Sequence, residues 1–370
     1  MNKLSWLRIA LTSLAVFFVL EFTMQQAGAQ ASSGSEEKKL IPRTPEDTEN
    51  ARLADRHIVL QVVATDASGK AISGLQQQDF TILDNDQPQK MSSFEALQGA
   101  TADPPVEVIL LADMVNTSFQ RVGYERDQIS KFLRQNNGQL AYPTTLIMFS
   151  DSDTKIQPQP TRDGNALANL LASSESSLRT INRAQGVYGA EERLQLSLNA
   201  LHQLIAYEGT KPGRKLLVWI SPGWPLLSGP RIEYSAKQQE AMFNWIAEFS
   251  NGLRTSRITL FAVDPLGTDG SVLHDFYYQG FLKGVRKVDQ ANSGNLALQV
   301  LATQSGGRVL NTSNDLTSEI NASVADASAY YVMSFEAAPA DKSNEYHSIT
   351  VKIDKTGMKA RTNLAYYGQP

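Results

Sequence analysis

One stretch of this chain limits its possible folds more than any other, namely the apolar run of residues 106–112 that ends at Asp113. Only Glu107 interrupts the run, and a short apolar segment of this kind is typical of a strand buried on both faces. Such strands belong to parallel sheets that helices cover on both sides. In open α/β sheets, ligands bind beyond the carboxyl ends of the strands. Asp113 therefore marks the edge of the sheet where we expect the functional site.

Strand-like and helix-like patterns alternate through residues 104–327. The helical segments carry apolar stripes with a period of about 3.6 residues, for example Leu194, Leu198, Leu201 and Ile205. This alternation predicts an α/β domain with a doubly wound, mostly parallel sheet of Rossmann type. Its buried strands are expected at residues 106–112, 145–150, 215–221, 258–264 and 308–311.

Alternating apolar and polar residues predict short strands near both ends of the chain. These strands are expected at residues 58–66, 80–84 and 91–97, and again at 329–336, 347–354 and 359–362. Three short strands are too few to bury a core alone. We therefore expect residues 56–98 and 328–368 to pair into one small antiparallel β module, into which the α/β domain of residues 104–327 is inserted. Two independent β pieces are the alternative.

Residues 1–29 have the features of an export signal peptide. A positively charged start precedes an apolar stretch at residues 9–20, and residues 27–29 read Ala-Gly-Ala, which fits a cleavage site. The apolar stretch is short for a bilayer span, and an uncleaved membrane anchor is the alternative. Residues 30–55 are small, polar and charged, which predicts a flexible linker. No later segment is apolar for long enough to cross a membrane, so the sequence predicts a secreted or periplasmic protein.

The composition argues against several classes of function. Without the signal peptide the chain has 32 basic and 37 acidic side chains, a net charge of about −5, which argues against nucleic acid or anionic lipid as the main partner. There is no cysteine, hence no disulfide, thiol nucleophile or cysteine metal site. The histidines are scattered, at His57, His202, His274 and His347, and no P-loop or G-x-S-x-G motif is present. The sequence does not predict an enzyme.

Three of the expected strands end in a carboxylate, at Asp113, Asp151 and Asp264. Parallel strands would bring these side chains to one edge of the sheet. One hypothesis is a site for a hard cation such as Mg²⁺, bound weakly. Its oxygen ligands would come from Asp113, Asn116, Thr117 and Ser118, with Asp151 or Asp264 completing the set. The alternative is that these aspartates only cap helices and turns.

An apolar strand that ends in Asp, followed by helices and strands in this order, resembles the von Willebrand factor A (VWA) domain. The metal-ion-dependent adhesion site of that family reads Asp-x-Ser-x-Ser, and the matching positions here are Asp113, Val115 and Thr117. The first ligand is kept, the second is lost and the third is changed conservatively. The loop at residues 185–190 offers no Thr, and Ser221 stands where the family has an Asp after the next buried strand. The resemblance therefore implies a degenerate metal site.

A closer resemblance covers almost the whole chain beyond the signal peptide. Its motifs are residues 75–85, residues 213–223, Gly306-Gly307-Arg308 before Asn314-Asp315-Leu316, and Tyr330-Tyr331. They are similar to the VWA-related family found chiefly in acidobacteria. The resemblance implies an exported protein with a variant A domain and flanking strands, without an established activity. The first motif of that family often keeps an Asp and an Asn three residues later, which matches Asp113 and Asn116.

The sequence therefore predicts an exported binding or adhesion module that recognises a protein or a surface polymer, with weak or absent dependence on divalent metal. The partner-binding edge is expected to include Asp113, Ser221, Trp224 and Asp264. Trp224 would be an exposed aromatic anchor, although packing in the core is the alternative. A metal-assisted hydrolase that uses Asp113, Asp151 and Asp264 is the second hypothesis, and a structural envelope component is the third.

Overall fold

The computed structural model describes residues 7–9, 56–151, 154–157, 159–173, 186–227, 233–265 and 277–370. Apart from residues 7–9, the predicted signal peptide and linker lie outside the described residues, as do the loops between these ranges. Within the described ranges, no helix is long and apolar enough to cross a membrane.

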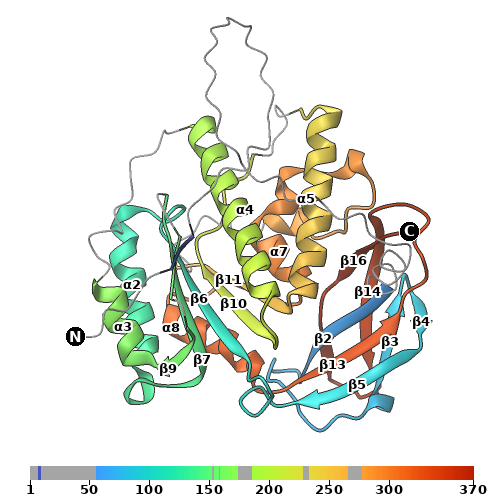
Figure 1. Cartoon of the computed structure of the whole chain (residues 1–370), viewed down its shortest axis with the longest axis horizontal. Coiled ribbons are helices and arrows are strands. Elements are labelled where there is room, and N and C mark those ends of the chain that lie inside the picture. The colour runs from blue at the N-terminus through green and yellow to red at the C-terminus, as the bar shows by residue number, and fades with distance from the viewer. Residues whose placement is uncertain are drawn as a thin grey trace, which may run out of the picture.

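A mostly parallel sheet forms the centre of the larger domain, as predicted (Figure 1). Its strands follow the order β1 (Leu7–Ile9), β8 (Thr154–Ile156), β7 (Gln139–Phe149), β6 (Glu107–Asp113), β10 (Lys215–Ile220), β11 (Ile258–Val263) and β12 (Val309–Leu310). The last five are mutually parallel, whereas β1, β8 and the short β9 (Thr161–Asp163) run antiparallel to their neighbours. Every residue of β10 and β11 is buried, which agrees with sequences that are apolar apart from Lys215 and Thr259.

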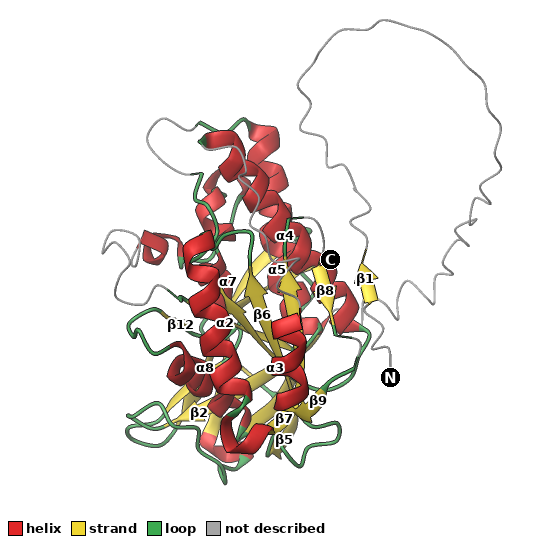
Figure 2. Ribbon diagram, turned by 90° about the vertical axis from the view of Figure 1, so that its left-hand side faces the viewer, coloured by secondary structure: helices red, strands yellow, loops and turns green. Residues whose placement is uncertain are grey.

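Helices cover both faces of this sheet. One face packs against α2 (Phe119–Leu133), α3 (Gly164–Ser173) and α8 (Leu316–Val324), and the other against α4 (Val187–Gly209), α5 (Ala236–Thr255) and α7 (Leu298–Gln304). Figures 1 and 2 show the two groups on opposite sides of the strands. Within β6 the side chains alternate between the two cores, because Val108 and Leu110 face one group and Ile109 and Leu111 the other.

Short 3₁₀ turns complete the described elements. They are η1 (Gln77–Asp79), η2 (Gln135–Gly138), η5 (Tyr277–Phe281), η6 (Val288–Gln290), η7 (Ser293–Leu296) and η8 (Ala325–Ala327). Three of them, η5, η6 and η7, follow one another between β11 and α7, a segment without a clear strand or helix period.

The terminal strands form a β-sandwich of two four-stranded antiparallel sheets. One sheet has the order β15 (Lys359–Arg361), β2 (His57–Thr65), β13 (Tyr330–Glu336) and β5 (Met91–Leu97), and the other β16 (Ala365–Gly368), β14 (Glu345–Ile353), β3 (Phe80–Asp84) and β4 (Gln87–Gln89). In the first sheet Leu60 is opposite Met333, and in the second Ile82 is opposite Val351. All four side chains belong to one buried core. The predicted pairing of N-terminal with C-terminal strands is confirmed, and the alternative of two independent pieces is wrong.

The edge strand β1 lies within the predicted signal peptide. It pairs with β8 over three residues, with Leu7 opposite Ile156. Removal of residues 1–29 would take β1 away, so β8 would then be the edge strand on that side of the sheet.

The sandwich is fixed to the α/β domain by buried polar contacts. The side-chain amide of Asn251, on α5, donates to the carbonyl oxygen of Tyr367 at 2.8 Å and accepts from its backbone N–H at 2.9 Å. Elsewhere, the buried guanidinium of Arg214 stacks over the ring of Tyr330 and donates to the carbonyl oxygen of Asp326 at 3.1 Å. Because these contacts join the sandwich to the α/β domain, they help to fix the geometry of the junction.

Candidate functional site

The strand order reverses between β6 and β10, and Asp113 ends the first of these strands. The chain passes from β6 outward through β7 and β8 and then returns to β10 on the other side. In doubly wound sheets the crevice at such a switch point is the usual ligand site. Ser221, which directly follows β10, lies beside Asp113 here, since Ile220 is paired with Ala112 in the neighbouring strand.

The carboxylate of Asp113 is completely buried and is held by N–H donors of this chain. Oδ1 accepts from the backbone N–H groups of Val115 and Asn116, each at 3.0 Å. Oδ2 accepts from the side-chain amide of Asn116 at 2.8 Å and from the indole Nε1 of Trp219 at 3.0 Å. Burial raises the pKa of Asp113, and the hydrogen bonds from Asn116, Trp219 and Ser221 oppose that shift.

Asn116 links this carboxylate to helix α4. Its side-chain N–H₂ also donates to Oγ of Ser197 at 2.9 Å, and that hydroxyl donates to the carbonyl oxygen of Arg193, one turn earlier in the helix. The amide oxygen of Asn116 is buried and has no hydrogen-bond partner among the described residues. Ser197 was not predicted as a site residue, because a serine in the middle of an apolar helix stripe gives no sequence signal of its own.

Trp219 and Trp224 pack against each other inside the domain. Their ring centroids lie 5.1 Å apart in an edge-to-face arrangement, and Phe149 contacts the far side of Trp219 at 5.9 Å. Trp224 is only 2% exposed, and its indole nitrogen has no hydrogen-bond partner among the described residues. The prediction of an exposed anchor at Trp224 is therefore wrong. The ring instead belongs to the hydrophobic core that contains Trp219.

The other members of the predicted partner-binding edge are buried as well. Asp113, Ser221 and Asp264 are 0%, 1% and 6% exposed. Their side chains cannot form an open contact surface, so the prediction of direct contact with a partner through them is corrected. The physical reason is that Asp113 accepts from N–H groups of the fold and the hydroxyl of Ser221 accepts from the backbone N–H of Gly223, so neither faces solvent.

The other predicted ligands that follow β6 and β7 are Thr117, Ser118 and Asp151. Thr117 is 5% exposed and its hydroxyl donates to Oε1 of Glu125 at 3.2 Å. Ser118 is exposed and precedes α2 as its N-cap residue, without a side-chain capping bond. Asp151 is half-buried after β7. In the described ranges, no three His, Cys, Asp or Glu side chains come together as a possible metal site.

The residues at the switch point do not fit Mg²⁺. A hard cation needs several fixed oxygens with lone pairs available to it. A carboxylate offers about four such lone-pair positions, and at Asp113 four N–H groups already point at them. Val115, at the position of the second ligand in the family motif, is buried in the hydrophobic core. Trp219 thus supplies an N–H donor where a cation would need open space.

Two further carboxyl groups lie buried near this edge, Glu125 on α2 and Glu319 on α8. Each has one side-chain oxygen without a hydrogen-bond partner among the described residues. Burial raises the pKa of Glu125 well above its usual value, and the charges of Asp113 and Asp264 add to the shift. Burial raises the pKa of Glu319 to about 7, while the backbone N–H groups of Ser313 and Thr312 oppose it.

Neither glutamate was predicted as a site residue, although the sequence contains a signal for both. Glu125 falls between Val122 and Ile129 on the buried stripe of α2, and Glu319 directly precedes Ile320 on that of α8. An acidic residue at the spacing of an apolar stripe predicts a buried carboxyl group. Burial, with a smaller contribution from the charge of Asp264, raises the pKa of both side chains and so favours their protonated forms.

Comparison with known proteins adds no family assignment. No family model and no curated protein matches the chain. A mutated aerotolerance-related membrane protein from Bacteroides fragilis is similar in structure, with a TM-score of 0.33 and 18% identity over 59% of this chain and 98% of its own. A manganese-loaded TRAP protein from Plasmodium vivax has a TM-score of 0.36 and 9% identity, over 76% of this chain and 100% of its own. The SpRpn10 VWA domain has a TM-score of 0.26 and 13% identity, over 58% of this chain and 93% of its own.

TM-scores this low carry no argument about ligands or activity. The VWA-like fold is therefore assigned from this chain's own strand order and helix layers.

The two buried tryptophans offer a matched test of the hydrogen bond to Asp113. Trp219→Phe and Trp224→Phe remove the same atoms from the same core, but only the first removes a hydrogen bond. A hydrogen bond to a charged group contributes about 1.5–3 kcal/mol. Urea denaturation should show that Trp219→Phe lowers the free energy of unfolding by about that much more than Trp224→Phe. Equal losses would mean that the indole N–H does not support the carboxylate.

The raised pKa of Glu319 predicts a pH-dependent stability. The pKa of Glu319 is about 7 in the folded state, against an ordinary value of 4.5. The contribution of this group to stability is therefore complete below pH 4.5 and is lost as the pH rises through about 7. Glu319→Gln keeps an oxygen for the N–H of Ser313 and cannot ionise. The variant should gain stability relative to the wild type between about pH 5 and pH 8. Urea titrations at both values measure this gain, and an unchanged difference would contradict it.

Proposed function

We propose that this chain is an exported VWA-like binding module that recognises a protein or a surface polymer without a divalent cation at the switch point. The observation behind the proposal is the state of Asp113, whose carboxylate is buried and accepts hydrogen bonds from Val115, Asn116 and Trp219. In A domains generally, the metal offers an open coordination position to a carboxylate of the partner. That mode of recognition needs a free ligand set, and the groups that would supply it are occupied.

Export is supported by the sequence at the start of the chain. The charged start, the apolar stretch at residues 9–20 and the Ala-Gly-Ala at residues 27–29 fit a signal peptide. The absence of cysteine is compatible with this destination, because the two large cores of the α/β domain and the core of the sandwich stabilise the chain without disulfides.

A hydrolytic function receives no comparable support from the described residues. Asp113 is engaged, and three of the histidines pair with carboxylates at separate places, His57 with Glu336, His202 with Glu248 and His347 with Asp84. The hydrogen bonds given for the side chains of these three pairs include none to a Ser, Thr or Lys side chain that could act as a nucleophile. His274 lies outside the described residues.

Co-sedimentation with cell envelopes tests this proposal. The protein, purified after export, is mixed with envelopes from the organism that makes it, once with EDTA and once with Mg²⁺, and serum albumin serves as the control. We expect saturable binding with the same dissociation constant under both conditions, because no cation takes part at Asp113. Binding that disappears in EDTA would contradict the metal-independent mode. Absence of any binding above albumin would contradict the function as a binding module and favour a structural role.

A further inference from the structure

An open cleft of about 670 Å³ lies where the α/β domain meets the sandwich. One wall is the segment from η5 to η7 and the other is Tyr346 on β14. The lining residues that matter here are Lys283, Gly284, Arg286, Gln290, Asn292 and Tyr346. A volume of this size is within the range of small-ligand sites in proteins. None of the residues predicted from the sequence lies in this cleft.

The cleft is positively charged although the chain as a whole is acidic. Lys283 and Arg286 are exposed, and neither forms an ion pair with a carboxylate of the described residues. No aspartate or glutamate of the described ranges lines the cleft, and Asp289, in the same segment, is not part of its wall. Two cations without partners among these residues, in one concave surface, attract an anion more strongly than isolated surface charges do.

The guanidinium of Arg286 is held in position by packing. It lies 5.0 Å from the centre of the Tyr346 ring, while its backbone N–H donates to Oε1 of Gln290 at 3.0 Å. The ring of Tyr346 rests directly on Gly284, where an added Cβ would lie 2.1 Å from the phenol carbon Cζ. On its other side Tyr346 meets Tyr367 edge to face, and the hydroxyl of Tyr367 donates to the carbonyl oxygen of Val285. The Tyr346 ring is thus well supported, and its contact with the exposed Arg286 favours one orientation of the guanidinium, which lowers the entropy lost when a ligand binds.

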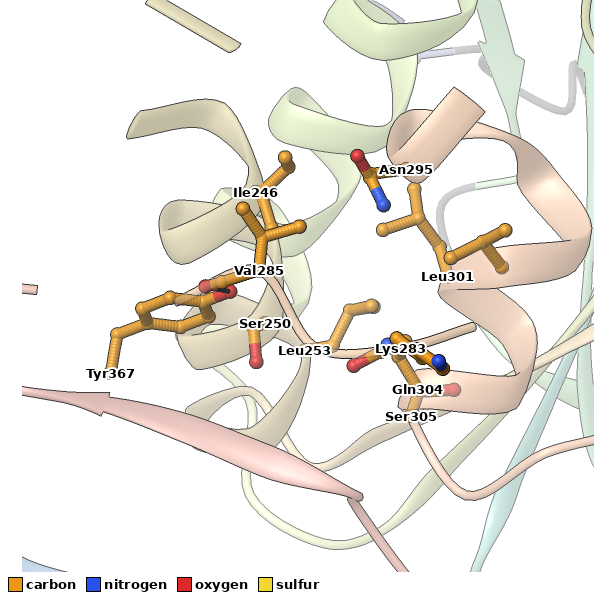
Figure 3. Close-up of a pocket in the computed structure, with 11 residues that line it drawn as sticks. Ile246, Ser250, Leu253, Lys283, Val285, Asn295, Leu301, Gln304, Ser305 and Tyr367 are labelled. Carbon is orange, nitrogen blue, oxygen red and sulfur yellow. Dashed lines mark hydrogen bonds between the residues drawn. The ribbon is translucent and has the colours of Figure 1, made fainter. Parts of the chain in front are cut away.

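A smaller cavity behind the cleft is not part of the ligand site. It has a volume of about 20 Å³ and shares Lys283, Val285 and Asn295 with the cleft (Figure 3). Figure 3 shows it enclosed between α5, α7 and the strand that carries Tyr367. This space holds nothing larger than a water molecule, so a ligand is confined to the open cleft.

The polar groups available in the cleft are donors. Arg286, Lys283 and the hydroxyl of Tyr346 have no side-chain hydrogen bond to a described residue, whereas the side-chain oxygens of Gln290 and Asn292 already accept from backbone N–H groups. A guanidinium in a fixed orientation is suited to bidentate binding of a carboxylate. An acidic peptide would bring backbone N–H groups, for which the Tyr346 hydroxyl is the one side-chain oxygen without a bond among these lining residues, whereas each sugar hydroxyl can turn to accept from the cationic donors.

We propose that this cleft binds the carboxylate-bearing sugars of an acidic polysaccharide, with Arg286 and Lys283 as the anion contacts and Tyr346 as the support of Arg286. The inference rests on the proposed binding function and names the chemical class of its ligand. Uronic acid units fit, because each combines one carboxylate with several hydroxyl groups. The partner is then a surface polymer and not a protein.

Fluorescence anisotropy with labelled oligogalacturonate tests the inference, with labelled dextran as the neutral sugar and polyglutamate as the acidic peptide. The wild-type protein should bind oligogalacturonate more tightly than either. Arg286→Gln should weaken this binding by about tenfold or more. The affinity of Arg286→Lys should lie between those of Arg286→Gln and the wild type, because lysine keeps the positive charge but lacks the two parallel N–H donors of the guanidinium. Lys287→Gln removes a charge from the neighbouring residue, which does not line the cleft, and should stay within about twofold.

Several results would overturn the inference. Equal losses for Arg286→Gln and Lys287→Gln would indicate general electrostatic attraction only. Dextran binding as tight as oligogalacturonate binding would remove the role of the carboxylate, and tighter binding of polyglutamate would identify a peptide ligand. Because Lys283, Arg286 and Lys287 are all exposed, unchanged melting curves should accompany all variants. If the Lys283→Gln and Arg286→Gln double variant still sediments with envelopes like the wild type, the proposed function stands and the cleft is not its site.

Discussion

The buried carboxylate of Asp113 is the interaction on which the geometry of the switch point depends. A buried charge without partners would cost several kcal/mol, so its position requires donors in fixed places. They come from the turn after β6, at Val115 and Asn116, and from the adjacent strand through Trp219. Through Asn116 the same network reaches Ser197 on α4. One side chain therefore ties a strand, its neighbour and a covering helix together.

This network shows how a VWA-like fold can bury an aspartate at the end of its central strand without a cation. When indole and amide N–H groups surround a carboxylate, its negative charge is stabilised without a cation. The loss of the second ligand at Val115 then costs nothing in coordination and adds an apolar side chain to the core. Asp113 is thus part of the framework of the fold, and under the proposed function recognition would use other surfaces. The cleft beside Tyr346 is the described surface whose unpaired donors suit an anionic ligand.

The sequence was informative where a pattern repeats along the chain. The apolar run before Asp113 placed β6, and the alternating residues near both ends led to the paired strands of the sandwich. It was uninformative where distant segments meet. Strand periodicity shows that Trp219 is buried but not that its N–H meets Asp113, which lies 106 residues earlier. Likewise, the burial of Trp224 depends on the path of a loop, and the cleft joins Arg286 to Tyr346 across the interface of two modules.

The indole N–H of Trp219 reports most directly on the central claim, and hydrogen exchange measured by NMR can follow it. In EDTA this proton should exchange far more slowly than an exposed indole, because it is buried and donates to Asp113. Addition of millimolar Mg²⁺ should change neither its exchange rate nor its chemical shift. Rapid exchange in EDTA, or a shift on addition of Mg²⁺, would show that the carboxylate is available to a cation and would contradict the account.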